Sequence, residues 1–362
     1  MENLDPRPAV LASRSPDEFL ARLVETGLAS AAAGLVTQRG IPAWSGAAGV
    51  VRHRGASAKP ETLFDLSSLT KPFVATLAVL LARAGELPLT ARIGDLVPSA
   101  RGRAARATLE SLLRHRSGLV PWAPLESLCR RNSEATARLL ASDLWQATGP
   151  VYSDLGYILW ARLAELHLGV GLADLLRGRV LRPLDLHRPR WRPAASEAVA
   201  ESRLDRKREA ELAGALGFVL RRPLSPPPVG VVQDGNARFL GGVAGHAGLF
   251  ADTASVAALA AEWLRPRRLL RRAEVAAALG APAGEYALGW ARRRVRGTAG
   301  AALSPRAFGH AGSTGTTVWA DPERGLVFVL LAHRTSGIDW KPLRRAFHRL
   351  AARPAAPRRG RP

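Results

Sequence analysis

The sequence predicts an α+β protein in which both ends of the chain contribute strands and the middle is helical. Two segments place β-forming runs on either side of a turn: residues 35–51 around a Gly/Pro turn, and residues 316–332 around Pro-Glu-Arg-Gly. Between about residues 86 and 245 the pattern is helical and rich in loops. The chain has 362 residues, of which 47% are hydrophobic, so it can bury a large core.

The N-terminal segment predicts a helix followed by the first hairpin. Ser15 and Glu18 have the spacing of a capping box, and Pro16 stands at the first helical position, where its missing N–H has no intrahelical partner. An apolar stripe follows over residues 19–24. We therefore expect a helix from Pro16 with one apolar face.

A serine and a lysine three residues apart begin the next predicted helix. Pro72 marks its first turn, and the nearly all-apolar run 73–85 indicates a helix that is buried on most sides. Residues i and i+3 share a helix face, so the Lys71 amine can reach the Ser68 hydroxyl. This arrangement is typical of an acylating serine with a built-in base. The Ser-x-x-Lys pattern alone also fits an ordinary buried helix with a capping serine.

The C-terminal segment predicts a second hairpin and a last helix. Residues 316–321 and 326–332 are rich in β-forming side chains and flank the turn at 322–325. One apolar stripe then defines the helix, formed by Leu343, Phe347 and Leu350.

Two further motifs follow the Ser-x-x-Lys pattern in the chain. Tyr152-Ser153-Asp154 stands on a loop ahead of the helical run 155–168, and His310-Ala311-Gly312 precedes the β-rich run 316–319. In isolation, a core tyrosine and a strand-end histidine would explain both.

A serine with a lysine, a Tyr-x-polar loop, and a basic residue before x-Gly are, in this order, the elements of the penicillin-recognising serine hydrolases. The chain resembles the β-lactamase-related family, which includes class C β-lactamases, D-alanyl-D-alanine carboxypeptidases and related esterases. The resemblance spans roughly residues 30–350. It also rests on FDLSSLTKPF (64–73), LLRHRSGL (112–119), YSDLGYIL (152–159), DGNARFLGGVAGHAGLF (234–250), ALGW (287–290) and FGHAGSTGTTVWADPERGLVFVLL (308–331).

This resemblance implies a β-lactamase/transpeptidase-like fold. An antiparallel sheet from both chain ends would be covered by the terminal helices, with an all-helical region inserted and the active site between them. We expect one catalytic domain over residues 1–352. Its α/β part would comprise about residues 15–85 and 246–352, and its mainly helical insert about residues 86–245. The last ten residues, 353–362, are expected to be a disordered basic tail.

The same resemblance assigns roles in an acyl-enzyme mechanism. Ser68 would attack the acyl carbon, and either Lys71 or Tyr152, with its pKa lowered by nearby ammonium charge, would take the proton. Tyr152 would also activate water for deacylation. The backbone N–H groups of Ser68 and Ser313 would bind the oxyanion. Gly312 would leave room for the substrate to approach the strand edge.

Two residues depart from the pattern of efficient β-lactamases. Asp154 stands where an asparagine amide would contact the acyl-amide group, and its carboxylate offers no N–H donor and would keep Lys71 protonated. His310 stands where many β-lactamases have lysine, and a largely neutral imidazole anchors a substrate carboxylate weakly. Together they favour an esterase or peptidase.

Other motifs have weaker claims. A second Gly-His-Ala-Gly at 245–248 leads into a helical run rather than a hairpin, so we expect His246 on a loop that shapes the cleft. Residues 233–236 either line the same cleft or form an exposed turn, and His115 is expected to be structural. No HExxH or CxxC spacing indicates a metal, and we expect no cofactor.

The charge of the chain does not by itself indicate a nucleic-acid partner. The formal net charge is +22, but arginine supplies all except four of the 52 basic residues, and they are spread along the chain. No docking motif with interleaved aromatics accompanies them. We expect no specific nucleic-acid binding, and a diffuse attraction to anionic surfaces stays open.

The remaining features concern compartment and assembly. A single Cys129 excludes an intrachain disulfide, and no apolar run is long enough to span a bilayer. No signal-peptide pattern is recognisable at the N-terminus, which favours a cytoplasmic protein, or a periplasmic one if the start is truncated or export is non-standard. We expect a monomer that acts on a small-molecule ester or amide.

Three functions remain as hypotheses. The first is a serine hydrolase that cleaves an ester or amide, such as a β-lactam, a D-Ala-D-Ala-like peptide or a small ester. The second is a catalytically weak or inactive relative that binds a ligand or cell-wall fragment, which Asp154 makes conceivable. The third is a binder of nucleic acid or anionic surfaces, supported by net charge alone.

Overall fold

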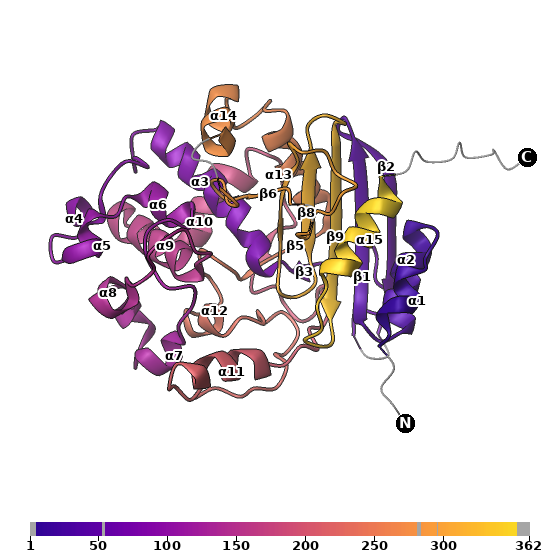
Figure 1. Ribbon diagram of the computed structural model, residues 1–362, viewed down its shortest axis with the longest axis horizontal. Coiled ribbons are helices and arrows are strands. Elements are labelled where there is room, and N and C mark those ends of the chain that lie inside the picture. Colours follow the sequence, from indigo (N-terminus) through magenta and orange to yellow (C-terminus); the bar gives the residue numbers. More distant parts are fainter. Residues whose placement is uncertain (1–4, 53–54, 281–283, 295, 353–362) are drawn as a thin grey trace, which may run out of the picture.

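A computed structural model of the chain describes residues 5–52, 55–280, 284–294 and 296–352. It confirms the α+β prediction, with the elements layered around one main sheet (Figure 1). Within those ranges the sheet has six antiparallel strands in the order β2-β1-β9-β8-β7-β6. Their bounds are Ala29–Gln38 (β1), Ile41–Gly49 (β2), Ala291–Arg292 (β6), Phe308–Ala311 (β7), Thr317–Asp321 (β8) and Leu326–Arg334 (β9). The predicted basic tail, 353–362, lies outside the described residues.

Both chain ends meet inside this sheet. The N-terminal strand β1 lies between β2 and the C-terminal strand β9, so that Gly34 faces Leu330 and Leu35 faces Val329. The two predicted hairpins are therefore neighbours in space, although nearly the whole chain separates them in sequence.

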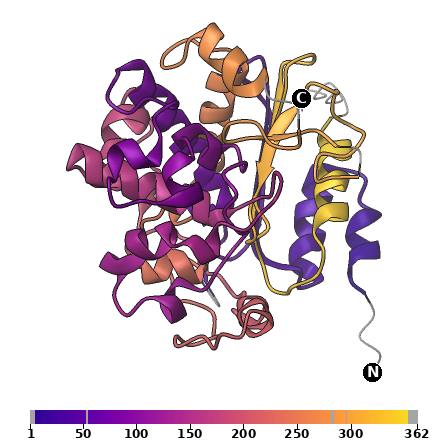
Figure 2. The same ribbon diagram turned by 60° about the vertical axis from the view of Figure 1, so that its left-hand side comes forward.

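Helices from the two chain ends cover one face of the sheet (Figures 1 and 2). They are α1 (Arg7–Leu11), α2 (Pro16–Glu25) and α15 (Lys341–Ala351). The first turn of α2 forms as predicted, because the Ser15 hydroxyl accepts a hydrogen bond from the Glu18 N–H at 3.1 Å. The rings of Phe19 and Phe347 lie 5.8 Å apart and join α2 to α15. The apolar stripes predicted for both helices thus face each other over the sheet.

The opposite face of the sheet is covered by α13 (Thr253–Leu264), which contacts β1, β8 and β9, with α3 (Thr70–Arg83) and the helical region beyond it (Figure 1). Every residue of α3 from Thr70 to Leu81 is buried, which confirms the prediction for the apolar run. A single hydrophobic cluster extends from Val329 of the sheet through Leu77 of α3 to Leu159 of α9 (Asp154–Leu168). The sheet and the helical region therefore share one core.

The region from residue 86 to 245 is mainly helical, as predicted. Besides α9 it contains α4 (Ile93–Leu96), α5 (Gly102–Arg106), α6 (Leu109–Leu113), α7 (Leu125–Leu128), α8 (Ala135–Leu140), α10 (Leu172–Leu176), α11 (Lys207–Ala215) and α12 (Gly235–Phe239); α14 (Arg272–Gly280) follows later in the chain. The region from residue 86 to 245 also contains a short strand, β4 (Arg190–Trp191), which pairs with β5 (Leu249–Ala251). Because β5 also pairs with β3 (Phe64–Asp65), this small sheet ties the helical region to the segment that leads into Ser68.

Two strands differ from the sequence prediction. β1 begins at Ala29, six residues before the predicted Leu35, because the small residues of this stretch are weak strand formers in isolation. Their smallness suits the packed position: a Cβ on Gly34 would lie 2.6 Å from the Trp44 ring. His310, placed by the sequence ahead of a strand, lies within one of its own, β7. No helix in the described ranges is both long and apolar enough to cross a membrane.

Candidate active site

The predicted nucleophile lies on a tight turn at the start of α3. Residues Ser67–Leu69 form a 3-10 turn that continues directly into the helix, so Ser68 and Lys71 lie on one face. The turn is fixed from below by Asp65, whose Oδ1 accepts the Ser67 N–H at 2.9 Å. Ser67 itself has a φ of 50°, in the left-handed region that residues other than glycine seldom adopt. The backbone next to the nucleophile is thus strained.

Lys71 is fully buried and contacts the predicted nucleophile directly. Its Nζ lies 2.9 Å from Ser68 Oγ and 2.7 Å from Asp154 Oδ1, and it also approaches the His246 carbonyl at 3.4 Å. As an ammonium, Lys71 donates to all three oxygens. The structure therefore brings Ser68, Lys71 and Asp154 together, although 83 residues separate the last two.

Tyr152 forms one wall of this group. It lies just ahead of α9, as predicted, and its ring lies 4.9 Å from Lys71 Nζ. His115 holds the tyrosine loop, because its ring lies 4.4 Å from the Tyr152 ring and its Nδ1 accepts the Ser153 N–H at 3.0 Å. This confirms a structural place for His115.

The predicted electrostatic effect on Tyr152 is wrong. Burial and the negative charge of Asp154 raise the pKa of the Tyr152 hydroxyl well above its usual value, despite a hydrogen bond with Ser68 that opposes the rise. The expectation considered only the Lys71 ammonium and omitted burial and Asp154. Tyr152 is therefore a neutral phenol in the resting site, able to donate a proton rather than to accept one.

His310 completes the opposite wall. In β7 it pairs with Val318 of β8, and its ring lies 6.0 Å from that of Tyr152. Its Nδ1 lies 3.1 Å from the Ala311 carbonyl, which can only accept, so Nδ1 carries the proton and Nε2 is an acceptor. Burial and the Lys71 ammonium lower the pKa of His310 to about 3, which confirms a neutral imidazole at pH 7.

Gly312 and Ser313 line the site together with Ser68, as expected. The reason for glycine at position 312 differs from the expected one, which was room for the substrate. A Cβ on Gly312 would lie 2.2 Å from Thr316 Oγ1 and 2.6 Å from the Leu66 carbonyl, so contact between protein segments already requires glycine here. The expected oxyanion donor, the Ser313 N–H, is engaged: it donates to Ser67 Oγ at 3.1 Å. The two hydroxyls of Ser67 and Ser313 also lie 2.7 Å apart.

A second layer lies behind Lys71. The His246 Nε2 lies 2.9 Å from Asp234 Oδ1, and both side chains are buried or nearly so. Burial raises the pKa of Asp234, but the adjacent His246 lowers it more, so the pKa of this carboxyl lies well below its ordinary value. Gln233 belongs to the same layer, because its N–H donates to Asp65 Oδ2 at 2.8 Å. These residues support the site from behind; Gln233 and Asn236 are buried rather than members of an exposed turn.

The site opens into a cavity of about 780 Å³. Six of the predicted residues line it, with Lys71 below them: Ser68, Tyr152, Asp154, His310, Gly312 and Ser313. The sequence did not predict the rest of the lining, which includes Tyr286 and four basic residues, Arg294, Arg296, Lys341 and Arg344. Tyr286 immediately precedes the family-like stretch 287–290, a signal that could have identified it.

Arg344 is the best placed of these basic residues. It is buried, and its Nη2 donates to the Gly312 carbonyl at 2.5 Å. Burial lowers the pKa of Arg344 to about 9, and the guanidinium remains charged at pH 7. An arginine on an amphipathic C-terminal helix carries no sequence signal that distinguishes it from the other arginines of this chain.

The chain is similar to known proteins of one family. Residues 17–353 match the family model described as Beta-lactamase. The chain is 33% identical over 152 residues to Penicillin-binding protein 4 of Amycolatopsis lactamdurans, a match that spans 39% of each protein. It is 26% identical to N-acetylmuramyl-L-alanine amidase of Bacillus subtilis (strain 168), over 78% of this chain and 70% of that protein.

A solved structure confirms the predicted fold. EstCE1, described as a hydrolase with promiscuous acyltransferase activity, matches with a TM-score of 0.74 at 18% identity. The match covers 96% of this chain and 100% of the other. The arrangement of sheet, covering helices and inserted helical region is therefore that of a β-lactamase/transpeptidase-like protein.

Proposed function

The chain belongs to the β-lactamase family of serine hydrolases, and on this premise we propose that it cleaves an ester or amide bond through an acyl-enzyme on Ser68. The observation that carries the proposal is the position of the buried Lys71 amine, 2.9 Å from Ser68 Oγ and 2.7 Å from Asp154 Oδ1. An unactivated serine is a poor nucleophile at neutral pH and needs a base within this distance.

The Lys71–Asp154 pair provides a proton relay. While Lys71 is an ammonium, it has no lone pair with which to accept the Ser68 proton. Shifting one proton along the 2.7 Å bond gives a neutral amine and a carboxylic acid, a form favoured when substrate excludes water from the buried pair. The amine then takes the Ser68 proton as Oγ bonds to the acyl carbon.

Tyr152 acts as the acid of the same cycle. Its phenol keeps its proton at neutral pH because of the raised pKa, so it can protonate the leaving group when the tetrahedral intermediate collapses. Lys71, which now holds the serine proton, can return one to the phenolate. In deacylation the neutral Lys71 amine takes a proton from water as the water oxygen bonds to the acyl carbon. It gives that proton to Ser68 Oγ as the bond between Oγ and the acyl carbon breaks and the acid is released.

The basic wall of the cavity favours substrates that carry a carboxylate. Arg296, Lys341 and Arg344 line it. The two acidic residues of the cavity are both paired with cations, Asp154 with Lys71 and Glu285 with Arg294, so neither cancels the charge of those three. His310 is neutral, whereas the guanidinium of Arg344 is a cation that bonds directly to the Gly312 carbonyl. D-Ala-D-Ala-like peptides and β-lactams carry such a carboxylate, and among small esters we expect acidic ones to be preferred.

The test is covalent labelling of Ser68. Wild type should react with a fluorophosphonate, and intact-mass analysis after incubation with penicillin, a p-nitrophenyl ester and a D-Ala-D-Ala peptide should show which substrates acylate it. Ser68→Ala should abolish every adduct, while its circular dichroism stays that of the wild type. Ser99→Ala, an exposed serine outside the site, should label normally. A label on any other serine would refute the assignment.

A further inference from the structure

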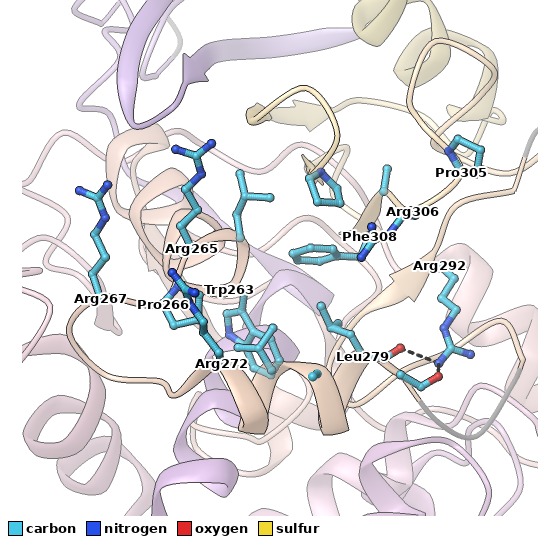
Figure 3. A pocket seen from close by; sticks show the side chains of 16 residues that line it. Trp263, Arg265, Pro266, Arg267, Arg272, Leu279, Arg292, Pro305, Arg306 and Phe308 are labelled. Carbon is cyan, nitrogen blue, oxygen red and sulfur yellow. Dashed lines mark hydrogen bonds between the residues drawn. The ribbon is translucent and has the colours of Figure 1, made fainter.

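A second cavity of about 850 Å³ lies on the side of α14, apart from the catalytic cavity, and the two share no lining residue (Figure 3). Volumes of 300–1,000 Å³ are typical of small-molecule sites. Strand β6 separates the two cavities: Ala291 lines the catalytic one and Arg292 the other. A ligand in the second cavity would therefore leave Ser68 accessible.

The floor of this second cavity is apolar and rigid. Trp263, Leu279 and Phe308 project into it from α13, α14 and β7 (Figure 3). Trp263 is held from behind, because its indole N–H donates to Thr76 Oγ1 at 2.8 Å and its ring packs edge-on against Trp290 at 5.7 Å. Such a preformed apolar surface favours burial of a hydrocarbon chain.

The rim of the cavity is uniformly basic. Arg265, Arg267, Arg272 and Arg306 line it and are exposed, and none of their guanidinium groups has a partner within the described ranges (Figure 3). Arg292 is different, since its guanidinium donates to the Leu279 and Gly280 carbonyls.

No acidic side chain lines the cavity within the described part of the chain. The nearest carboxylates on the same elements are already engaged. Glu262 of α13 accepts backbone N–H groups of residues 267–270, and Glu274 of α14 is paired with Arg83. The unpartnered arginines therefore present an uncompensated positive charge above an apolar floor.

We propose that this cavity binds a single-chain anionic amphiphile, an alkyl carboxylate whose chain lies on the Trp263–Phe308 floor and whose head pairs with the rim arginines. Arginine matches a carboxylate in a two-pronged geometry, which makes it suited to hold the head. A second copy of this chain would not fit, because its own basic rim would be repelled. A nucleic acid would leave the concave apolar floor without a partner.

Titration calorimetry at low ionic strength tests the proposal with the full chain, after Ser68 has been blocked by a fluorophosphonate. Decanoate should bind saturably with one site. Acetate, which has the head alone, and decyltrimethylammonium, which has the chain with the opposite charge, should bind at least tenfold more weakly. Equal binding of either compound would overturn the proposal, because one half of the recognition would be unused.

Charge reversal locates the site. The double variant Arg272→Glu/Arg306→Glu should weaken decanoate binding at least tenfold. The matched variant Arg14→Glu/Arg106→Glu changes the same charge at exposed arginines outside the cavity and should alter binding less than twofold. Equal weakening in both variants would mean a non-specific effect of net charge. Loss of decanoate binding on blocking Ser68 would place the ligand in the catalytic cavity. Either outcome would refute the proposal.

Discussion

Ser67 engages the Ser313 N–H, the donor that we expect to bind the oxyanion. Its hydroxyl accepts the Ser313 N–H and approaches the Ser313 hydroxyl at 2.7 Å, while its backbone is held at a φ of 50°. In the resting site the donor is thus satisfied by the protein itself. Acylation through this donor requires the Ser67 hydroxyl to leave it, and breaking that bond adds to the barrier.

Replacing Ser67 with glycine should therefore speed acylation. Glycine adopts the left-handed backbone without strain and removes the competing hydroxyl, so we expect a 3- to 10-fold rise in the rate of Ser68 labelling, about 0.6–1.4 kcal/mol. Stopped-flow acylation with a p-nitrophenyl ester measures it. Ser67→Ala removes the hydroxyl but keeps the Cβ and separates the two causes. A slower reaction in both variants would show that Ser67 helps to position the nucleophile.

We expect Asp154 to set the balance between amide and ester substrates. Its carboxylate pairs with Lys71 but offers no donor to an acyl amide. Asp154→Asn supplies an N–H donor and removes the partner that keeps Lys71 an ammonium. We expect acylation by a chromogenic cephalosporin, relative to a p-nitrophenyl ester, to rise at least tenfold.

Tyr152→Phe serves as the comparison for this experiment. It removes the proposed acid from both reactions, so both substrates should slow by about 10²–10⁴-fold with little change in their ratio. Should Asp154→Asn slow both substrates equally, Asp154 would act only as the proton carrier of the relay proposed above, and the new amide donor would have no effect on substrate preference.

At the scale of single elements, the turn that carries Ser68 is built on a buried carboxylate. Asp65 accepts the N–H groups of Ser67 and Gln233, and its own N–H donates to His333 Nε2. Burial raises the pKa of Asp65 to about 6, from 3.8, although the backbone donors oppose the rise. The unfolded chain therefore loses this proton at a lower pH than the folded one.

The sign of the pH dependence follows. Between about pH 4 and 6 the folded state binds more protons at Asp65 than the unfolded state does. The stabilisation that comes from protonated Asp65 is therefore complete below pH 4 and is lost as pH rises through 6. A rise of about two in pKa corresponds to roughly 3 kcal/mol. As pH rises from 4 to 6, the unfolding free energy of wild type should therefore fall by up to roughly 3 kcal/mol relative to that of Asp65→Asn. Urea unfolding at pH 4, 5, 6 and 7 measures it, and a constant difference would contradict it.

The sequence predicts the elements whose signals are local. The capping box at Ser15, the apolar run after Pro72 and the turn at 322–325 each determine a structure within a few residues. The features that the sequence could not predict depend on contacts between segments that are distant in the chain. The alanine-rich start of β1 is a strand only because β2 and β9 flank it, and Arg344 reaches Gly312 only after the last helix has docked. The raised pKa of Tyr152 likewise requires the burial that the whole site creates.

For the molecule as a whole, the shared core predicts one folding unit. Residues of the sheet, of α3 and of the helical region belong to a single hydrophobic cluster, and the small sheet β3-β5-β4 adds a second link. We therefore expect residues 5–352 to unfold in one transition. The midpoint of urea unfolding by circular dichroism should coincide with that for loss of fluorophosphonate labelling at Ser68.

Two separated midpoints would contradict this expectation. If the helical region melted first, labelling would disappear while most of the sheet signal remained, because Tyr152 and Asp154 come from that region. The domain boundaries proposed from the sequence would then mark independent units.

The pairing of β1 with β9 has a consequence for synthesis on the ribosome. Gly34 can pair with Leu330 only after the roughly 300 residues between them have been made, so one edge of the first hairpin stays unpaired until then. Closing so long a loop makes the central contact of the sheet a late and slow event. Ser68 and Lys71 emerge roughly 240 residues before the strand that brings Gly312 and Ser313 against them. The nascent chain therefore carries its nucleophile long before it can become an enzyme.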